Sequence, residues 1–323
     1  MKRIIGSMMA LILGAVVSPS APAQAFPTKS IRLIVPYAPG GNVDISARIV
    51  GPGLHQLLGQ SVVVDNRPGG GGNVGAGLVA KASADGYTLL VGSSGPLSIN
   101  PIVYKDMPYD SIKDFAPVST VQVVPLVLTV SPKFAVNSVK ELIDRAKAQP
   151  GKITIASAGT GTTNHFAIEL FSSMTGARLL HIPYKGSGQA LGELLGGQVN
   201  TMIDQLTSSM GFIKDGKLKV IAVTAAKRVS TLPNVPTLAE SGVAGYEAST
   251  YLGILGPAGT PRPVVTKLNA ALRKVMDIPA VQERFRTLGA NPGASSPEEF
   301  GRIIREELDK WRSLAKSAKL QFN

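Results

Sequence analysis

The sequence predicts an α/β protein with two lobes, each a mainly parallel sheet flanked by helices. Short β-branched runs alternate along the chain with segments of helical periodicity, which is the pattern of parallel sheets with helical crossovers. A unit of strand, glycine-rich loop and helix start also occurs twice, in Ile31–Leu58 and in Ile153–Gly176. With 323 residues, the chain is long enough for two lobes, each with its own core.

The two repeated units both end in a loop that suits an anion. In the first, the predicted strand Ile31–Val35 runs into the proline- and glycine-rich loop Pro36–Gly41, and Asn42 is a good N-cap for the helix that follows. In the second, the strand Ile153–Ser157 leads into the loop Ala158–Thr162. Unpaired N–H groups and the dipole at a helix N-terminus attract carboxylate or phosphate. Either loop alone is equally consistent with an ordinary tight turn, but the pair predicts two lobes that close on one acidic ligand.

The N-terminus has the three regions of a secretory signal peptide. Lys2-Arg3 is basic, Ile4–Val17 is largely apolar, and Ala23-Gln24-Ala25 is a small-residue cleavage site. The alternative, a membrane anchor, is disfavoured because the apolar run is too short for a spanning helix. We therefore predict cleavage after Ala25 and a soluble periplasmic protein that begins at Phe26.

The composition excludes several functions. The chain has no cysteine and only three histidines, so we expect no disulfide, no thiolate chemistry and no metal site. The net charge is +12, but an exported protein meets no nucleic acid, so we interpret the charge as a solvated surface that steers small anions. Gly70, Gly72 and Gly75 match a dinucleotide fingerprint only weakly, because no acidic residue ends the next strand. We expect no cofactor.

The rest of the chain keeps the alternation of strands and helices. Ser61–Asp65 and Thr88–Gly92 are predicted strands, and the second leads into two serines that either donate to a ligand or cap a turn. The long β-branched run Val118–Val130, broken by Pro125, is predicted to cross between the lobes. From Arg262 the chain becomes helical and charge-rich, as outer helices are. The predicted lobes are 26–125 plus 249–323, and 126–248.

Several motifs, in their order and spacing, resemble the Bug-type periplasmic receptors of the tripartite tricarboxylate transporter systems. They are IRLIVPYAPGG, VVVDNRPGGGGNVGA, DGYTLLVGSSG, HIPYKGSGQAL, GKLKVIAVT and GPAGTP, together with the segment Gly159–His165. The resemblance covers essentially the whole mature chain. It implies a Venus-flytrap fold of the type II periplasmic-binding-protein kind, with a small carboxylated ligand held largely by backbone N–H groups and ordered water.

Carried over by position, the resemblance assigns ligand contacts to the two loops and to a few residues around them. The first loop supplies Tyr37, Ala38, Gly40, Gly41, Asn42 and Asp44, and the second supplies Gly159, Thr160, Gly161, Thr162, Thr163 and His165. Ser93, Ser94, Tyr184, Lys185, Asp204 and Gln205 complete the predicted site. Neither loop contains an arginine or a lysine, so N–H groups and hydroxyls must meet the carboxylate.

Some of these residues have two interpretations. His165 either touches the ligand or satisfies a loop carbonyl. Asp44 either ties down its loop or binds the ammonium group of an amino acid. The same two interpretations apply to Asp204. Lys185 is either the cation for a distal carboxylate or a solvated loop residue. The sequence also departs from the family at Gly51-Pro52-Gly53, where the proline is expected to kink the first helix.

The predicted function is a monomeric receptor that captures a small mono- or dicarboxylate, aromatic and amino acids included, and delivers it to membrane transporter subunits without catalysis. Two alternatives stay open. One is a sensor that presents the same class of ligand in signalling. The other, less well supported, is an exported hydrolase, for which no Ser/His/Asp order or recognisable pair of carboxylates is present.

Overall fold

The computed structural model describes residues 26–320, in which strands and helices alternate. The first elements are β1 (Ile31–Val35), α1 (Asn42–Leu58), β2 (Val62–Asn66), η1 (Gly70–Gly72), α2 (Asn73–Ala80), β3 (Thr88–Ser93), η2 (Gly95–Ile99), α3 (Asn100–Val103) and β4 (Phe115–Val130). Then follow α4 (Val139–Ala148), β5 (Thr154–Ser157), α5 (Thr163–Thr175), β6 (Leu180–Pro183), α6 (Ser187–Gly196), β7 (Thr201–Gln205), α7 (Leu206–Lys214) and β8 (Lys219–Val223). The last are β9 (Ser249–Pro257), α8 (Arg262–Met276), α9 (Pro279–Thr287), β10 (Asn291–Pro292) and α10 (Pro297–Ser317). The predicted signal peptide lies outside the described residues.

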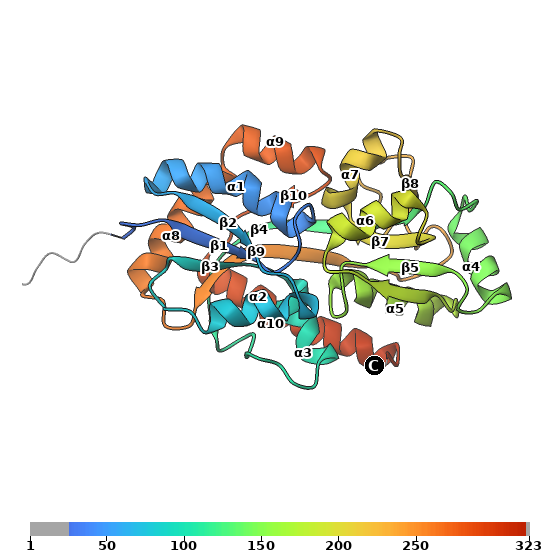
Figure 1. Cartoon of the computed structure of the whole chain (residues 1–323), viewed down its shortest axis with the longest axis horizontal. Helices are drawn as coiled ribbons and strands as arrows, with labels where there is room; N and C mark the ends of the chain where they lie inside the picture. Colours follow the sequence, from blue (N-terminus) through green and yellow to red (C-terminus); the bar gives the residue numbers. More distant parts are fainter. Residues whose placement is uncertain (1–25, 321–323) are drawn as a thin grey trace, which may run out of the picture.

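The strands form two parallel groups joined by two long antiparallel strands. Their order is β2-β1-β3-β9-β4-β7-β5-β6, with β8 and β10 paired to β4 beside this path. β1 pairs in parallel with β2 and β3, and β5 pairs in parallel with β6 and β7. β4 and β9 run antiparallel to their neighbours. The strands of the two groups point toward the middle of the molecule, so the fold is the predicted two-lobed α/β architecture (Figure 1).

Each parallel group is covered by helices on both faces. In β1, Leu33 and Val35 face the core shared with α1 and α8, whereas Ile34 faces the core shared with α2 and α10. In β5, Ile155 packs with α4 and α5, and Ala156 packs with α6. Successive side chains of a strand point to opposite faces, so these short apolar strands bury both sides.

Strand β4 and helix α10 connect the lobes, in addition to loops. The pairing of β4 with β9 ends at Pro125 and Ser249, and its pairing with β7 begins at Leu126. Helix α10 lies along the bottom of the molecule in Figure 1, and its Phe300 packs in the first lobe's core. Further along α10, Trp311 is fully buried in the second lobe's core, edge-on to Phe166 at 4.7 Å between ring centroids. Trp311 is therefore a packing residue. Within residues 26–320, no helix combines the length and the apolarity needed to cross a membrane.

Candidate functional site

Three helix N-termini converge on one cavity between the two sheets. Its volume is about 20 Å³. It is lined by the N-cap and first two residues of α1 (Gly41, Asn42, Val43), the equivalent residues of α5 (Thr162, Thr163, Asn164) and the first residue of α6 (Ser187). Tyr37, Ser93, Ala158, Gln205 and Thr250 complete the lining. These residues follow the carboxyl ends of parallel strands, which is where α/β sheets place their ligands.

No side chain that lines the cavity is charged. The electrostatic character of the cavity therefore comes from the helix ends, each of which carries a partial positive charge of about half a unit. Free N–H groups, hydroxyls and amides supply hydrogen bonds. Such an environment favours an anion without providing a fixed cation.

The start of α1 is secured by Asp44. Gly41, in an extended conformation, is the N-cap, so the predicted N-cap at Asn42 is wrong by one residue. The Asp44 carboxylate accepts a hydrogen bond from the Gly40 N–H at 3.0 Å and others from Arg48 and Asn66. Burial raises the pKa of Asp44, but these hydrogen bonds outweigh it and hold the pKa below its usual value. Asp44 does not line the cavity, so the geometry favours the interpretation that it ties down its loop.

The second loop is held by its own polar groups. Thr162 caps α5 by accepting from the His165 N–H, and the Thr162 hydroxyl donates to the Gly159 carbonyl at 2.7 Å. His165 Nδ1 accepts from the Gly161 N–H at 3.2 Å. His165 thus satisfies a loop amide rather than the expected loop carbonyl, and it is not part of the cavity lining.

His165 stacks on His181, with ring centroids 4.4 Å apart. The Ser157 hydroxyl accepts from the Gly159 N–H at 3.1 Å and is also hydrogen-bonded to His181 Nε2 at 2.6 Å. Burial, together with the neighbouring His165, lowers the pKa of His181 to about 4. The hydrogen bond to His181 thus holds Ser157 in place at the base of the second loop.

Behind the cavity lies a buried carboxylate that forms no ion pair with any residue of 26–320. Asp204 accepts hydrogen bonds from the hydroxyls of Ser187 and Ser209 and from the Asn164 amide. Burial raises the pKa of Asp204, and these hydrogen bonds only partly offset the rise. The Asn164 carbonyl oxygen accepts from Gln205 at 2.7 Å. Asp204 therefore orients two lining residues directly, Ser187 and Asn164, and a third, Gln205, through Asn164; it is not itself in the lining.

The lobes touch on both sides of the cavity. On one side the Ala38 N–H donates to the Lys185 carbonyl at 3.1 Å, and a Cβ on Gly188 would lie 2.4 Å from the Pro39 carbonyl oxygen. On the other side the Tyr104 hydroxyl donates to the Thr160 carbonyl at 3.0 Å. The Lys185 side chain is exposed. A cavity of about 20 Å³ has room for about one water molecule, so the lobes are closed.

The predicted site residues fall into two groups. Those that line the cavity are Tyr37, Gly41, Asn42, Ser93, Thr162, Thr163 and Gln205. Those outside its lining are Ala38, Gly40, Asp44, Ser94, Gly159, Thr160, Gly161, His165, Tyr184, Lys185 and Asp204. Val43, Ala158 and Asn164 lie in the segments Tyr37–Asp44 and Ala158–His165, to which the resemblance assigns the ligand, but they were not singled out; Ser187 and Thr250 were not expected at all. A signal for Ser187 was present, because it begins a helix directly after the short strand β6 and the loop 184–186.

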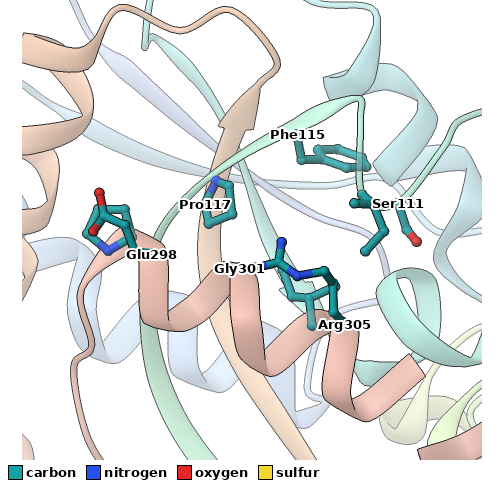
Figure 2. A pocket seen from close by; sticks show the side chains of 9 residues that line it. Ser111, Phe115, Pro117, Glu298, Gly301 and Arg305 are labelled. Atoms are coloured by element: carbon teal, nitrogen blue, oxygen red, sulfur yellow. The ribbon is translucent and has the colours of Figure 1, made fainter. Parts of the chain in front are cut away.

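A larger and more open pocket lies elsewhere on the first lobe (Figure 2). Its volume is about 340 Å³, and it is bordered by residues 111–117 and by Glu298, Gly301 and Arg305 of α10. None of the predicted site residues belongs to it, and the segments that border it include no interlobe loop. The small cavity between the lobes is the candidate site because the helix N-termini meet there.

Two α/β lobes joined by crossing strands, with a cavity between them, define the class of two-lobed solute-binding proteins. The chain belongs to the tripartite tricarboxylate transporter family of receptors, whose model matches residues 46–320. It is 37% identical over 317 residues to protein BugT of Bordetella pertussis, covering 98% of this chain and 97% of that protein.

Solved structures agree with this assignment. A Rhodopseudomonas palustris protein with adipate is 38% identical, with a TM-score of 0.88 over 91% of this chain and 98% of that one. MatC from the same organism, with bound malate, is 30% identical, with a TM-score of 0.87 over 90% of this chain and 99% of that one. The matched relatives are binding proteins, and the periplasmic binding protein BugD is among the structural neighbours.

Proposed function

We propose that this receptor binds a small organic acid, as its carboxylate, at the cavity between the lobes, which separate to make room for it. The observation that supports the proposal most directly is the convergence of three helix N-termini on a cavity without a charged side chain. The acids bound by two relatives, adipate and malate, belong to this class. The acid is delivered to membrane transporter subunits and is not chemically changed.

Hydrogen bonds from neutral donors are sufficient for useful affinity. Each hydrogen bond to a charged group contributes about 1.5–3 kcal/mol. Three or four of them offset much of an association cost of roughly 4–15 kcal/mol, so the expected dissociation constant is on the order of micromolar. We propose that the lining residues make the contacts and that the predicted residues outside the lining shape the loops. His165, Asp44 and Asp204 belong to the second group.

A thermal-shift panel tests the proposed ligand class. The panel contains acetate, benzoate, malate and adipate, each beside its amide. Ligand at 100 times its dissociation constant stabilises the folded protein by about 2.7 kcal/mol, a shift that is readily measured. We expect at least one acid to raise the melting temperature and its amide to leave it unchanged. Equal shifts with acids and amides would refute an anion site, and consumption of the bound acid on incubation would favour the hydrolase.

Two further proposals concern the chain itself. We propose that the signal peptide is removed after Ala25 in the periplasm, and N-terminal sequencing of the periplasmic protein tests this. We also propose that the lobes comprise residues 26–125 plus 249–323, and 126–248. The change of β4 from β9 to β7 between Pro125 and Leu126 supports this division. The burial of Trp311 among second-lobe residues indicates that the end of α10 serves both lobes.

A further inference from the structure

Asn42 presents an unused hydrogen-bond donor at the cavity. Among the buried side-chain polar atoms without a partner in residues 26–320, only Asn42 Nδ2 belongs to a residue that lines it. Asn42 is 3% exposed, so water does not readily replace the missing partner. A buried N–H group without an acceptor destabilises a fold, and such groups are therefore rare. The arrangement points to a ligand atom as the acceptor.

A chain of hydrogen bonds determines which atom of Asn42 faces the cavity. The Ser46 hydroxyl donates to the main-chain carbonyl of Asn42 at 2.6 Å, and a carbonyl can only accept. With its proton used, Ser46 Oγ must accept, and Gln122 Nε2 donates to it at 2.8 Å. The same Gln122 nitrogen donates to Asn42 Oδ1 at 2.6 Å. The amide oxygen of Asn42 is therefore engaged, and its Nδ2 is left without an acceptor.

We propose that Asn42 Nδ2 donates a hydrogen bond to a carboxylate oxygen of the ligand, and that Gln122 is the positioning residue that fixes the Asn42 amide for this contact. The proposal rests on the carboxylate-binding function and adds a specificity to it. A fixed N–H donor favours ligands that place an oxygen at that point, and it disfavours ligands that place a methyl or an ammonium group there. Gln122 lies on β4, so the donor is set by a crossing strand rather than by the binding loops.

Calorimetric titration of four proteins tests the proposal, using the acid of the panel that gives the largest thermal shift. Asn42→Ala removes the donor and should weaken binding about ten- to hundred-fold. Gln122→Met keeps the size of the side chain but frees the Asn42 amide, and should weaken binding about three- to ten-fold. In the Asn42→Ala background, Gln122→Met should change the affinity by less than about two-fold, because Gln122 acts through Asn42.

A matched control separates positioning from a general loss of stability. Gln282→Met removes a hydrogen bond from α9 to the Met276 carbonyl at the end of α8, and it should leave the affinity unchanged. The melting temperature without ligand is measured for every variant. If Asn42→Ala binds the acid with wild-type affinity, this inference is overturned. It is also overturned if Gln122→Met weakens binding equally with and without Asn42. In both cases the proposed carboxylate-binding function still stands. Failure of the wild-type protein to bind any acid of the panel overturns the proposed function, and this inference with it.

Discussion

The stacking of His181 on His165 beside the second loop depends on His181 staying uncharged. His181 Nε2 is hydrogen-bonded to the Ser157 hydroxyl, which in turn accepts from the Gly159 N–H. Protonation of His181 would place a charge against His165 in a largely buried position, with Glu169 of the next helical turn the nearby acid. The loop is therefore held by a group whose charge state changes with pH.

We predict that acidification destabilises the protein through His181. Its pKa is lowered from 6.5 to about 4 in the fold, so the unfolded chain binds the proton more readily. The stability that the neutral form of His181 contributes is fully present above pH 6.5 and is lost as the pH falls toward 4. The titration of His181 alone should lower the free energy of unfolding by about 2 kcal/mol between about pH 7 and about pH 5. Urea titrations at several pH values measure it. In His181→Gln the loss should largely disappear, and an undiminished loss would assign it to other groups.

At the scale of single residues, the sequence marks a loop of the candidate site where that loop has a distinctive composition. The glycine-rich loops before α1 and α5 were recognisable, and seven of the residues singled out line the cavity, but their contact with a ligand stays a prediction. Thr250 was not recognisable, because it lies at the start of strand β9, far along the chain from both glycine-rich loops. The contact of Gln122 with Asn42 likewise joins residues far apart in the chain, and no local pattern marks it.

At the scale of one element, α1 shows how packing outweighs local propensity. Gly51-Pro52-Gly53 lies inside a single helix, Asn42–Leu58. An interior proline costs about 3 kcal/mol in an isolated helix, so α1 owes its stability to its neighbours. At Gly53 a Cβ would lie 2.9 Å from both methyl carbons of Val275 in α8, whereas at Gly51 the nearest atom would be 3.9 Å away.

This difference predicts opposite effects for the same substitution two residues apart. Gly51→Ala should raise the free energy of unfolding by about 0.5–1 kcal/mol, because alanine favours the helix and fits the available space. Gly53→Ala should lower it, because crowding against Val275 costs about 1–3 kcal/mol and exceeds the gain in propensity. Chemical denaturation of both variants measures the pair. Equal stabilisation by both would show that α1 and α8 separate easily.

For the whole molecule, closure rests on a few hydrogen bonds between the lobes. Tyr104 is the clearest of them, because its hydroxyl donates from the first lobe to the Thr160 carbonyl of the second loop. Tyr109 offers a matched comparison, since its hydroxyl donates to Asn73 and Pro96 within the first lobe. A ligand gripped by both lobes shifts the population toward the closed state by its differential affinity.

We predict that Tyr104→Phe weakens ligand binding about two- to ten-fold, because one hydrogen bond of about 0.5–1.5 kcal/mol favours only the closed state. Tyr109→Phe should lower the melting temperature but leave the affinity unchanged. Calorimetry gives the affinities, and small-angle scattering should show a smaller radius with ligand in the wild-type protein. Loss of affinity in both variants would mean that closure does not depend on the Tyr104 contact in particular.

The small volume of the closed cavity also has a consequence for the speed of exchange. With room for about one water molecule between the lobes, an organic acid has no path in or out unless they separate. At high ligand concentration the rate of capture is then limited by the rate of opening, and diffusion no longer matters. The residence time of the acid is likewise the waiting time for an opening. Any partner that holds the lobes apart therefore speeds release without touching the acid.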